Sequence, residues 1–197
     1  MQKIIVLLLS ICTGVCSFCQ GNSLAVFEQQ RINYNKKGML VLGSWSAANI
    51  ITSAFAGGTS NRQAHYFHQM NIIWNGFNLA LAASGYINAT KEKTDNVNLT
   101  NVLGHQNKTE KLFLFNTGLD VAYITAGFYL KERGNRNANP EKLKGYGNAV
   151  ALQGGFLFLF DAIMYNVHNR HGRVLKTTTD KVQLVAGPIG VALAYHF

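Results

Sequence analysis

Cysteine is missing from most of the sequence. The three cysteines, Cys12, Cys16 and Cys19, all lie near the N-terminus, and residues 20–197 contain none. This excludes disulfide bonds, thiolate metal sites and cysteine nucleophiles from the remainder of the chain. Any chemistry carried out there has to come from other side chains.

Charged residues are also few. They make up 14% of the chain, against 48% hydrophobic residues, whereas soluble domains usually carry about 25% charged residues. The mean hydropathy is nevertheless only +0.04, which indicates that apolar residues are concentrated in segments separated by polar loops. The length of 197 residues is that of a single domain.

The basic residues are not clustered. The net charge of +9 comes from 18 Lys and Arg against 9 Asp and Glu, spread through every loop. Nucleic-acid binding would need basic residues on one face with aromatic residues between them. The pattern therefore predicts no nucleic-acid partner, and an anionic lipid surface is the simpler explanation for the positive charge.

Catalytic motifs are absent as well. The sequence contains no GxGxxG, P-loop, HExxH or GxSxG pattern, so we expect neither an enzyme nor a bound cofactor. Two histidine pairs, His65 with His68 and His168 with His171, have a spacing that could present two imidazoles to a metal. His65 and His68 lie at the start of the second predicted span, and His168 and His171 follow the fourth span on the opposite side of the membrane. The two pairs would therefore not come together in one molecule. We expect no metal.

The N-terminus has the pattern of a secretory signal peptide over residues 1–19. A short basic start precedes an apolar run from Ile4 to Leu9, and Ser17–Cys19 offers small residues for cleavage before Gln20. All three cysteines would leave with this segment. Lipidation of Cys16 or Cys19 is the alternative, but a bulky residue precedes each of them, which fits a lipobox poorly.

Four later segments are apolar and close to the roughly 20 residues that a spanning helix needs. They show no alternation of the kind found in a lipid-facing strand. A soluble four-helix bundle is the alternative, but Phe156–Phe160 has no polar face to present to water. The predicted spans are Gly38–Gly57, His65–Tyr86, Leu112–Leu130 and Gly145–Tyr165.

The first and third spans align without a gap, since Ile50–Phe55 matches Tyr123–Phe128. The second and fourth align less closely. This predicts one helical hairpin used twice in parallel orientation, with repeat units over about residues 38–88 and 111–166. The expected organisation is a signal peptide (1–19), an N-terminal extramembrane segment (20–37), a four-helix membrane domain (38–171) and a C-terminal β tail (172–197).

Polar residues inside the spans recur at helical spacing, and several fall at a similar depth when the rise is counted from the middle of each span. This predicts an internal polar layer, with Asp161 about 9 Å from it at roughly 1.5 Å per residue. Asparagines often only hold membrane helices together, whereas an intramembrane carboxylate is a functional-site hypothesis by default. The candidate binding residues are Asn49, His68, Asn71, Asn75, Asn78, Asn116, Asp120, Gln153 and Asp161.

The C-terminal residues Arg173–Phe197 alternate in the manner of a strand and end on an aromatic residue, as bacterial outer-membrane barrels do. A lone hairpin leaves unpaired edges, so the tail would pair with another envelope protein or lie in water. With the mature N-terminus outside, the loops on the cytoplasmic side hold fewer basic residues than the other side, the reverse of the positive-inside rule. This slightly favours the outer over the inner membrane.

Three segments, Phe67–Asn78, Gly145–Val150 and Gln153–Asp161, resemble an uncharacterised family of small, signal-peptide-bearing, four-helix membrane proteins of Gram-negative bacteria. The resemblance covers most of the mature chain and implies a four-helix fold in the cell envelope, with no assigned activity. It directs attention to Asn71, Asn75, Asn78, Gln153 and Asp161.

The sequence thus leaves two functions open. The first is a structural or accessory subunit of an envelope assembly. The alternative is a small transporter or ligand-binding membrane protein that uses the intramembrane Asn and Asp residues. A cavity lined by those residues would favour the alternative, and a tightly packed bundle would favour the first.

Overall fold

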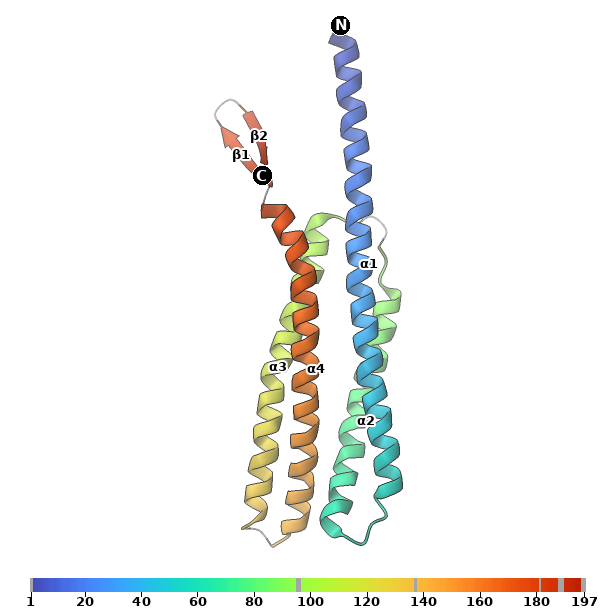
Figure 1. The fold of residues 1–197 in the computed structure, drawn as a ribbon, viewed down its shortest axis with the longest axis vertical. Coiled ribbons are helices and arrows are strands. Elements are labelled where there is room, and N and C mark those ends of the chain that lie inside the picture. The colour runs from blue at the N-terminus through green and yellow to red at the C-terminus, as the bar shows by residue number, and fades with distance from the viewer. Residues whose placement is uncertain (1, 95–96, 137, 181, 188–189, 196–197) are drawn as a thin grey trace.

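The computed structural model describes residues 2–94, 97–136, 138–180, 182–187 and 190–195, with side chains for 23–94, 97–136 and 138–175. Its body consists of long helices that form two hairpins, whose short connections lie at the same end of the bundle (Figure 1). The first hairpin pairs α1 with α2, and the second pairs α3 with α4. The helices are α1 (Gln2–Ala56), α2 (Arg62–Lys91), α3 (Leu99–Gly134) and α4 (Pro140–Asp180).

Asparagine caps determine where two of the helices begin. The Asn61 side chain accepts a hydrogen bond of 3.0 Å from the backbone N–H of Ala64 at the start of α2. Asn98 does the same for the N–H of Asn101 at the start of α3, at 2.8 Å. Each cap satisfies a donor that the first turn of a helix leaves unpaired, so α2 and α3 begin directly after these residues.

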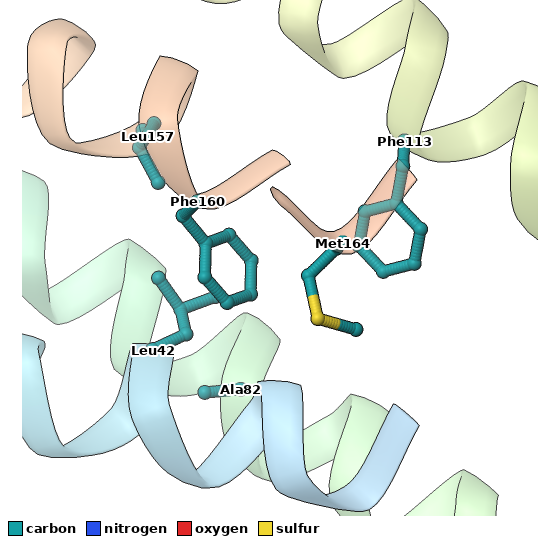
Figure 2. Packing of buried hydrophobic residues seen from close by; sticks show 6 residues of the cluster. All are labelled: Leu42, Ala82, Phe113, Leu157, Phe160 and Met164. Carbon is teal, nitrogen blue, oxygen red and sulfur yellow. The ribbon is translucent and has the colours of Figure 1, made fainter. Parts of the chain in front are cut away.

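A buried apolar cluster joins the two hairpins (Figure 2). Leu42 of α1 and Ala82 of α2 face Phe113 of α3 and Phe160 of α4 across the centre of the bundle. Leu157 and Met164 of α4 complete the cluster. Since α4 supplies the largest share of these side chains, it is the helix around which the two hairpins pack.

Glycines let α3 and α4 approach each other closely. A Cβ atom added to Gly127 would lie 2.5 Å from the backbone nitrogen of Ala151 and 2.7 Å from the carbonyl oxygen of Gly147. Backbone atoms cannot move aside as the end of a flexible side chain can. Small residues at such a crossing are how helices pack tightly in membranes.

Replacing Gly127 with alanine is therefore expected to lower the free energy of unfolding by about 2 kcal/mol, because the added methyl overpacks the crossing. The measurement is denaturant unfolding in detergent followed by circular dichroism. Gly118→Ala on the same helix is the matched control, since nothing lies within 4 Å of a Cβ added there. That variant should be neutral or more stable, because alanine favours helix over glycine by about 1 kcal/mol. Equal effects of the two variants would contradict the close packing.

The fold class predicted from the sequence needs two corrections, although an all-α body is confirmed. The first concerns the spans. By length and composition, two helices could cross a membrane, Ser23–Ala56 and Pro140–Leu175, each with a mean hydropathy of 1.4, which is weak evidence by itself. Within the described residues, α2 and α3 do not reach this level. Two of the four predicted spans thus qualify as candidates, because amides and other polar groups within α2 and α3 lower their hydropathy.

The second correction concerns the ends of the chain. Strand was predicted from residue 172 onward, but α4 continues to Asp180, so the β tail over 172–197 was wrong. Gly172 packs against Gln106 and Glu110 of α3, and this contact explains why the helix extends. Beyond it, β1 (Val182–Gly187) pairs antiparallel with β2 (Gly190–Tyr195). A partner bound through the tail stays untested.

The N-terminal predictions also stay untested. Residues 2–22 continue α1 as helix (Figure 1), and the side chains of Cys12, Cys16 and Cys19 lie outside the described residues. The predicted extramembrane segment 20–37 forms part of the same helix. The signal peptide and the internal repeat remain predictions.

Candidate functional site

The predicted polar layer forms two separate groups, and the first joins α1, α2 and α4. The Asn71 amide donates to Ser53 Oγ at 2.8 Å and to Asn49 Oδ1 at 3.1 Å. Gln153 Nε2 donates to Asn71 Oδ1 at 2.5 Å and to Asn49 Oδ1 at 3.3 Å, and its Oε1 accepts from Trp45 Nε1 at 2.9 Å. These hydrogen bonds hold three helices together, and of this group only Asn75 Oδ1 is buried without a partner among the described residues.

Two more predicted residues belong to the edge of this amide network. Asn75, fully buried, donates to the backbone oxygen of Asn71 at 2.8 Å. The half-buried His68 places Nδ1 3.2 Å from Ser53 Oγ. Both side chains are therefore anchored to the same contacts and help to pack α2 against α1.

The second group consists of carboxyl and amide side chains from the other hairpin and α2. Asp120 of α3 and Asp161 of α4 line the same cavity and are close enough to interact. Both aspartates are buried, at 3% and 5% exposure. Two carboxylates this close repel each other, and the repulsion is relieved when one of them takes up a proton.

This pair stands out because charge is otherwise absent around it. Only two Asp, Glu, Lys or Arg residues occur in the apolar parts of the four helices, and these are Asp120 and Asp161. Those parts are residues 38–61, 63–90, 112–130 and 145–169. These two carboxyls come from different helices, α3 and α4, and yet lie next to each other. Their proximity indicates a role in structure or in binding.

The aspartate pair lines a cavity of about 650 Å³ between the two hairpins. Apolar side chains form most of its wall, and Asn78 and Asn116 are the other hydrogen-bonding amides in it. Its lining residues are Met39, Leu42, Trp74, Phe77, Asn78, Leu81, Gly85, Leu112, Phe113, Asn116, Leu119, Asp120, Tyr123, Leu157, Phe160 and Asp161. An apolar cavity of this size with a few convergent polar groups is the usual form of a small-molecule site.

Two polar atoms of this cavity lack a partner. Asp120 Oδ2 and Asn78 Nδ2 are buried without a hydrogen bond from the described residues, although both side chains are at most 5% exposed. Buried polar atoms nearly always have a partner, since leaving one unpaired costs about 1–3 kcal/mol. The cavity wall therefore contains an acceptor of Asp120 and a donor of Asn78 that no described residue pairs.

The predicted depth of Asp161 was misleading. Its height was counted as about 9 Å from the layer on the basis of the helical rise, yet its carboxyl reaches Asp120. Side chains on a helix lean toward its N-terminus. In the antiparallel α3 and α4 the two carboxyls therefore lean toward each other, and the packing of Gly154 against Tyr123 and Ile124 sets the register of the two helices. Asn49, Asn71, Asn75 and Gln153, by contrast, do not line the cavity.

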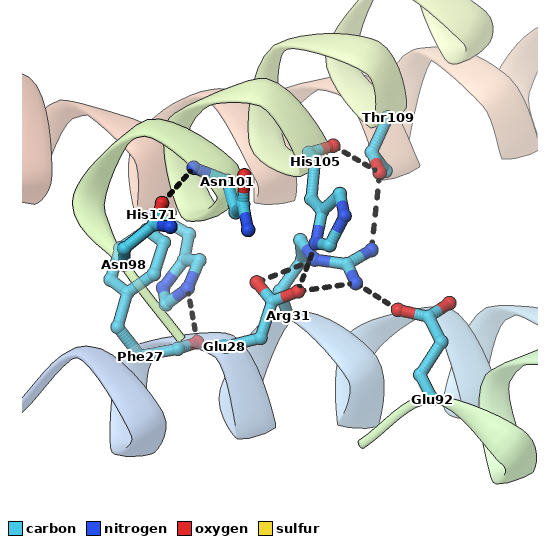
Figure 3. A network of polar contacts seen from close by, with 9 residues as sticks. All are labelled: Phe27, Glu28, Arg31, Glu92, Asn98, Asn101, His105, Thr109 and His171. Atoms are coloured by element: carbon cyan, nitrogen blue, oxygen red, sulfur yellow. Dashed lines mark hydrogen bonds and ion pairs between the residues drawn. The ribbon is translucent and has the colours of Figure 1, made fainter. Parts of the chain in front are cut away.

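A second polar cluster lies at the end of the bundle near Glu92 and was not predicted (Figure 3). Arg31 donates two hydrogen bonds of 2.9 Å to the Glu28 carboxylate and one of 3.3 Å to Thr109 Oγ1, and it also pairs with Glu92. His105 Nδ1 lies 2.6 Å from Glu28 Oε1. The Glu28 and Arg31 side chains are almost completely buried, at 1% and 4% exposure.

Two histidines and a glutamine extend this cluster toward α4. Gln106 Nε2 donates to the backbone oxygen of His168 at 2.6 Å, and His171 stacks on Phe27 with ring centroids 3.8 Å apart. Treating residues 20–37 as an extramembrane segment and beginning the third span only at Leu112 hid these contacts. The signal was present in the spacing, because Glu28 with Arg31 and Gln106 with Glu110 each lie one turn apart on a helix.

No metal site was expected, and the described side chains contain no group of three or more His, Cys, Asp or Glu able to hold one. The two histidine pairs have different partners. His65 Nδ1 lies 2.7 Å from the backbone oxygen of Gly57, whereas His171 Nε2 lies 3.1 Å from that of Phe27.

Comparison with known proteins places the chain in a family without giving it an activity. No curated protein and no solved structure matches it. Residues 41–162, more than half of the chain, match a family of unknown function, DUF6992. This match covers the amide network and, apart from Met39, all the residues that line the aspartate cavity. The chain therefore belongs to the DUF6992 family.

Proposed function

We propose that this protein is a membrane protein that binds a small amphiphilic molecule in the cavity between its two hairpins. The observation that carries the proposal is the cavity itself, whose apolar wall surrounds two buried polar atoms without partners. A purely structural subunit is expected to have a tightly packed bundle at this place instead.

The distribution of side chains supports the membrane part of the proposal. Large apolar residues point outward on every helix, among them Phe55 at 88% exposure, Phe77 at 70%, Phe115 at 67% and Ile163 at 61%. Amides and carboxyls fill the interior instead. This arrangement is costly in water and natural in lipid. In our proposal α1 and α4 cross the bilayer and α2 and α3 pack alongside them. The predicted signal peptide and the family resemblance support an envelope membrane of a Gram-negative bacterium.

The shape of the cavity supports a ligand taken from the lipid phase. Phe77, Leu81 and Leu112 line the cavity and are exposed by 70%, 62% and 55%, so the cavity opens sideways between α2 and α3. A molecule dissolved in the bilayer would reach the site through this opening. An apolar body would lie along the wall, and a polar head would lie at the aspartates.

Binding can be tested with 10-bromodecan-1-ol, whose bromine quenches tryptophan fluorescence. Trp74 lines the cavity and Trp45 does not, so we expect saturable quenching of the full chain in a nonionic detergent that is largely lost in Trp74→Phe. Gly85→Leu should weaken it at least tenfold, because Gly85 lines the cavity and a leucine there fills it. Gly76→Leu on the same helix is the matched control, since Gly76 is outside the lining and has open space around it.

Quenching that does not saturate, or that is equal in Gly85→Leu and Gly76→Leu, would show that the probe only partitions into micelles and would overturn the ligand site. Membrane location is tested separately by alkaline carbonate extraction of cells. We expect the chain to stay in the membrane pellet, and its release into the supernatant would contradict the membrane part of the proposal.

A further inference from the structure

We infer, on the basis of the proposed function, that the molecule bound in this cavity is a monovalent organic cation, an amphiphilic ammonium with an apolar tail. Asp120 and Asp161 would bind its positively charged head. The apolar wall toward Gly85 and Leu112 would hold its tail.

Charge is the first reason. Asp120 and Asp161 are both buried and line the cavity together, and two adjacent carboxylates would repel each other unless one of them took up a proton. In our inference the pair therefore carries one negative charge. No Lys, Arg or His is among the described residues that line the cavity, so nothing from the protein within it balances this charge. One positive charge on the ligand would.

The unpartnered atoms give the second reason. Asp120 Oδ2 is an acceptor, buried at 3% exposure and without a protein partner. A charged donor is the strongest complement to such an atom, because hydrogen bonds between ionised groups are about twice as strong as neutral ones. Asn78 Nδ2 offers a donor in the same cavity, which suits a hydroxyl or carbonyl oxygen near the cationic head.

The aromatic wall is the third reason. Trp74 and Tyr123 meet edge to face with ring centroids 4.9 Å apart, and both line the cavity together with Phe77, Phe113 and Phe160. Aromatic faces attract cations, and tryptophan does so most strongly. Tyr123 lies one helical turn from Asp120, so the aromatic contact and the negative charge are at the same end of the cavity.

The remaining length of the cavity fits a tail. From Asn78 to Gly85 on α2 and from Leu112 to Asn116 on α3, apolar side chains dominate the wall. At a rise of 1.5 Å per residue the stretch on α2 is about 10 Å long. A ligand with a cationic head and a linear or aromatic apolar body would thus satisfy both ends, whereas an inorganic cation would leave the apolar part empty.

Three probes with the same tail and different heads test this inference. Decyltrimethylammonium, decan-1-ol and decanoate compete with 10-bromodecan-1-ol for the full chain in nonionic detergent, and recovery of Trp74 fluorescence gives their affinities. We expect decyltrimethylammonium to bind at least tenfold more tightly than decanol, and decanoate to bind more weakly than decanol. A trimethylammonium head cannot donate a hydrogen bond, so decylammonium should bind more tightly still.

Aspartate variants separate charge from structure. Asp161→Asn keeps one carboxylate at Asp120 and should keep the preference for the cation within about threefold of the unchanged chain. Asp120→Asn/Asp161→Asn removes the charge and should abolish the preference, while 10-bromodecan-1-ol still binds. That last measurement shows that the double variant is folded and its cavity intact.

The experiments distinguish failure of the proposed ligand site from failure of the cationic ligand class. If 10-bromodecan-1-ol does not bind saturably, the proposed function fails and the inference fails with it. If it binds and the three heads compete equally, or if the double variant keeps the preference for the cation, the cavity is a ligand site but the cationic class is wrong. Tighter binding of decanoate would likewise overturn it.

Discussion

Replacing Arg31 with methionine is expected to lower the free energy of unfolding by about 3–5 kcal/mol, the usual cost of removing one partner of a buried ion pair. Glu28 would remain at 1% exposure with its main counter-charge gone. His105 Nδ1 stays 2.6 Å from Glu28 Oε1, but the His105 side chain is more than half exposed, so this contact is screened by solvent. Unfolding in mixed detergent micelles, followed by circular dichroism, measures the loss.

The double variant Glu28→Gln/Arg31→Met is the control for this prediction. It removes both charges and keeps the approximate volume of each side chain, so most of the lost stability should return. Replacing a buried ion pair by neutral residues is often close to neutral. A double variant as unstable as Arg31→Met would mean that packing of the arginine stem, not the unpaired carboxylate, sets the cost.

The cluster around Arg31 connects parts of the helices that are far apart in the sequence. Glu28 and Arg31 lie in α1, Thr109 and His105 in α3, and Glu92 directly follows α2 (Figure 3). By joining α1 to α3 it links the two hairpins at the end opposite their short connections.

Much of the helical body could be predicted from the sequence, because the cues were local. Long stretches without charge predicted helices within α1 to α4, and Asn61 and Asn98 are ordinary N-cap residues. The helix ends beyond the spans could not be predicted in the same way. The extension of α4 past residue 172 depends on Gly172 packing against Gln106 and Glu110, and such a tertiary contact leaves no local pattern.

The candidate site was predictable residue by residue but not as an arrangement. Asp120, Asp161, Asn78 and Asn116 were all singled out because each is polar within an apolar stretch. Their grouping could not be predicted from depth, since depth along a helix says nothing about which face a side chain occupies. In the structure Asn49, Asn71 and Gln153 hydrogen-bond to one another in the amide network, whereas the two carboxyls line the cavity.

That division predicts different consequences for the two groups. Gln153→Ala should lower the free energy of unfolding by about 3 kcal/mol and leave the cavity chemistry intact. Its side chain makes hydrogen bonds to Trp45, Asn49 and Asn71, each worth about 0.6 kcal/mol between membrane helices. Truncating this fully buried side chain also leaves a void, which supplies the remainder.

Gln69→Ala is the matched control, because Gln69 of α2 is exposed and accepts one hydrogen bond of 3.0 Å from Tyr146. Its loss should change the stability by less than about 0.5 kcal/mol, as is usual for surface substitutions. Both variants should bind 10-bromodecan-1-ol as the unchanged chain does, under conditions in which they remain folded. A Gln153 variant that kept its stability but lost binding would reverse the assignment, making the amide network part of the ligand site and the aspartate pair a structural contact.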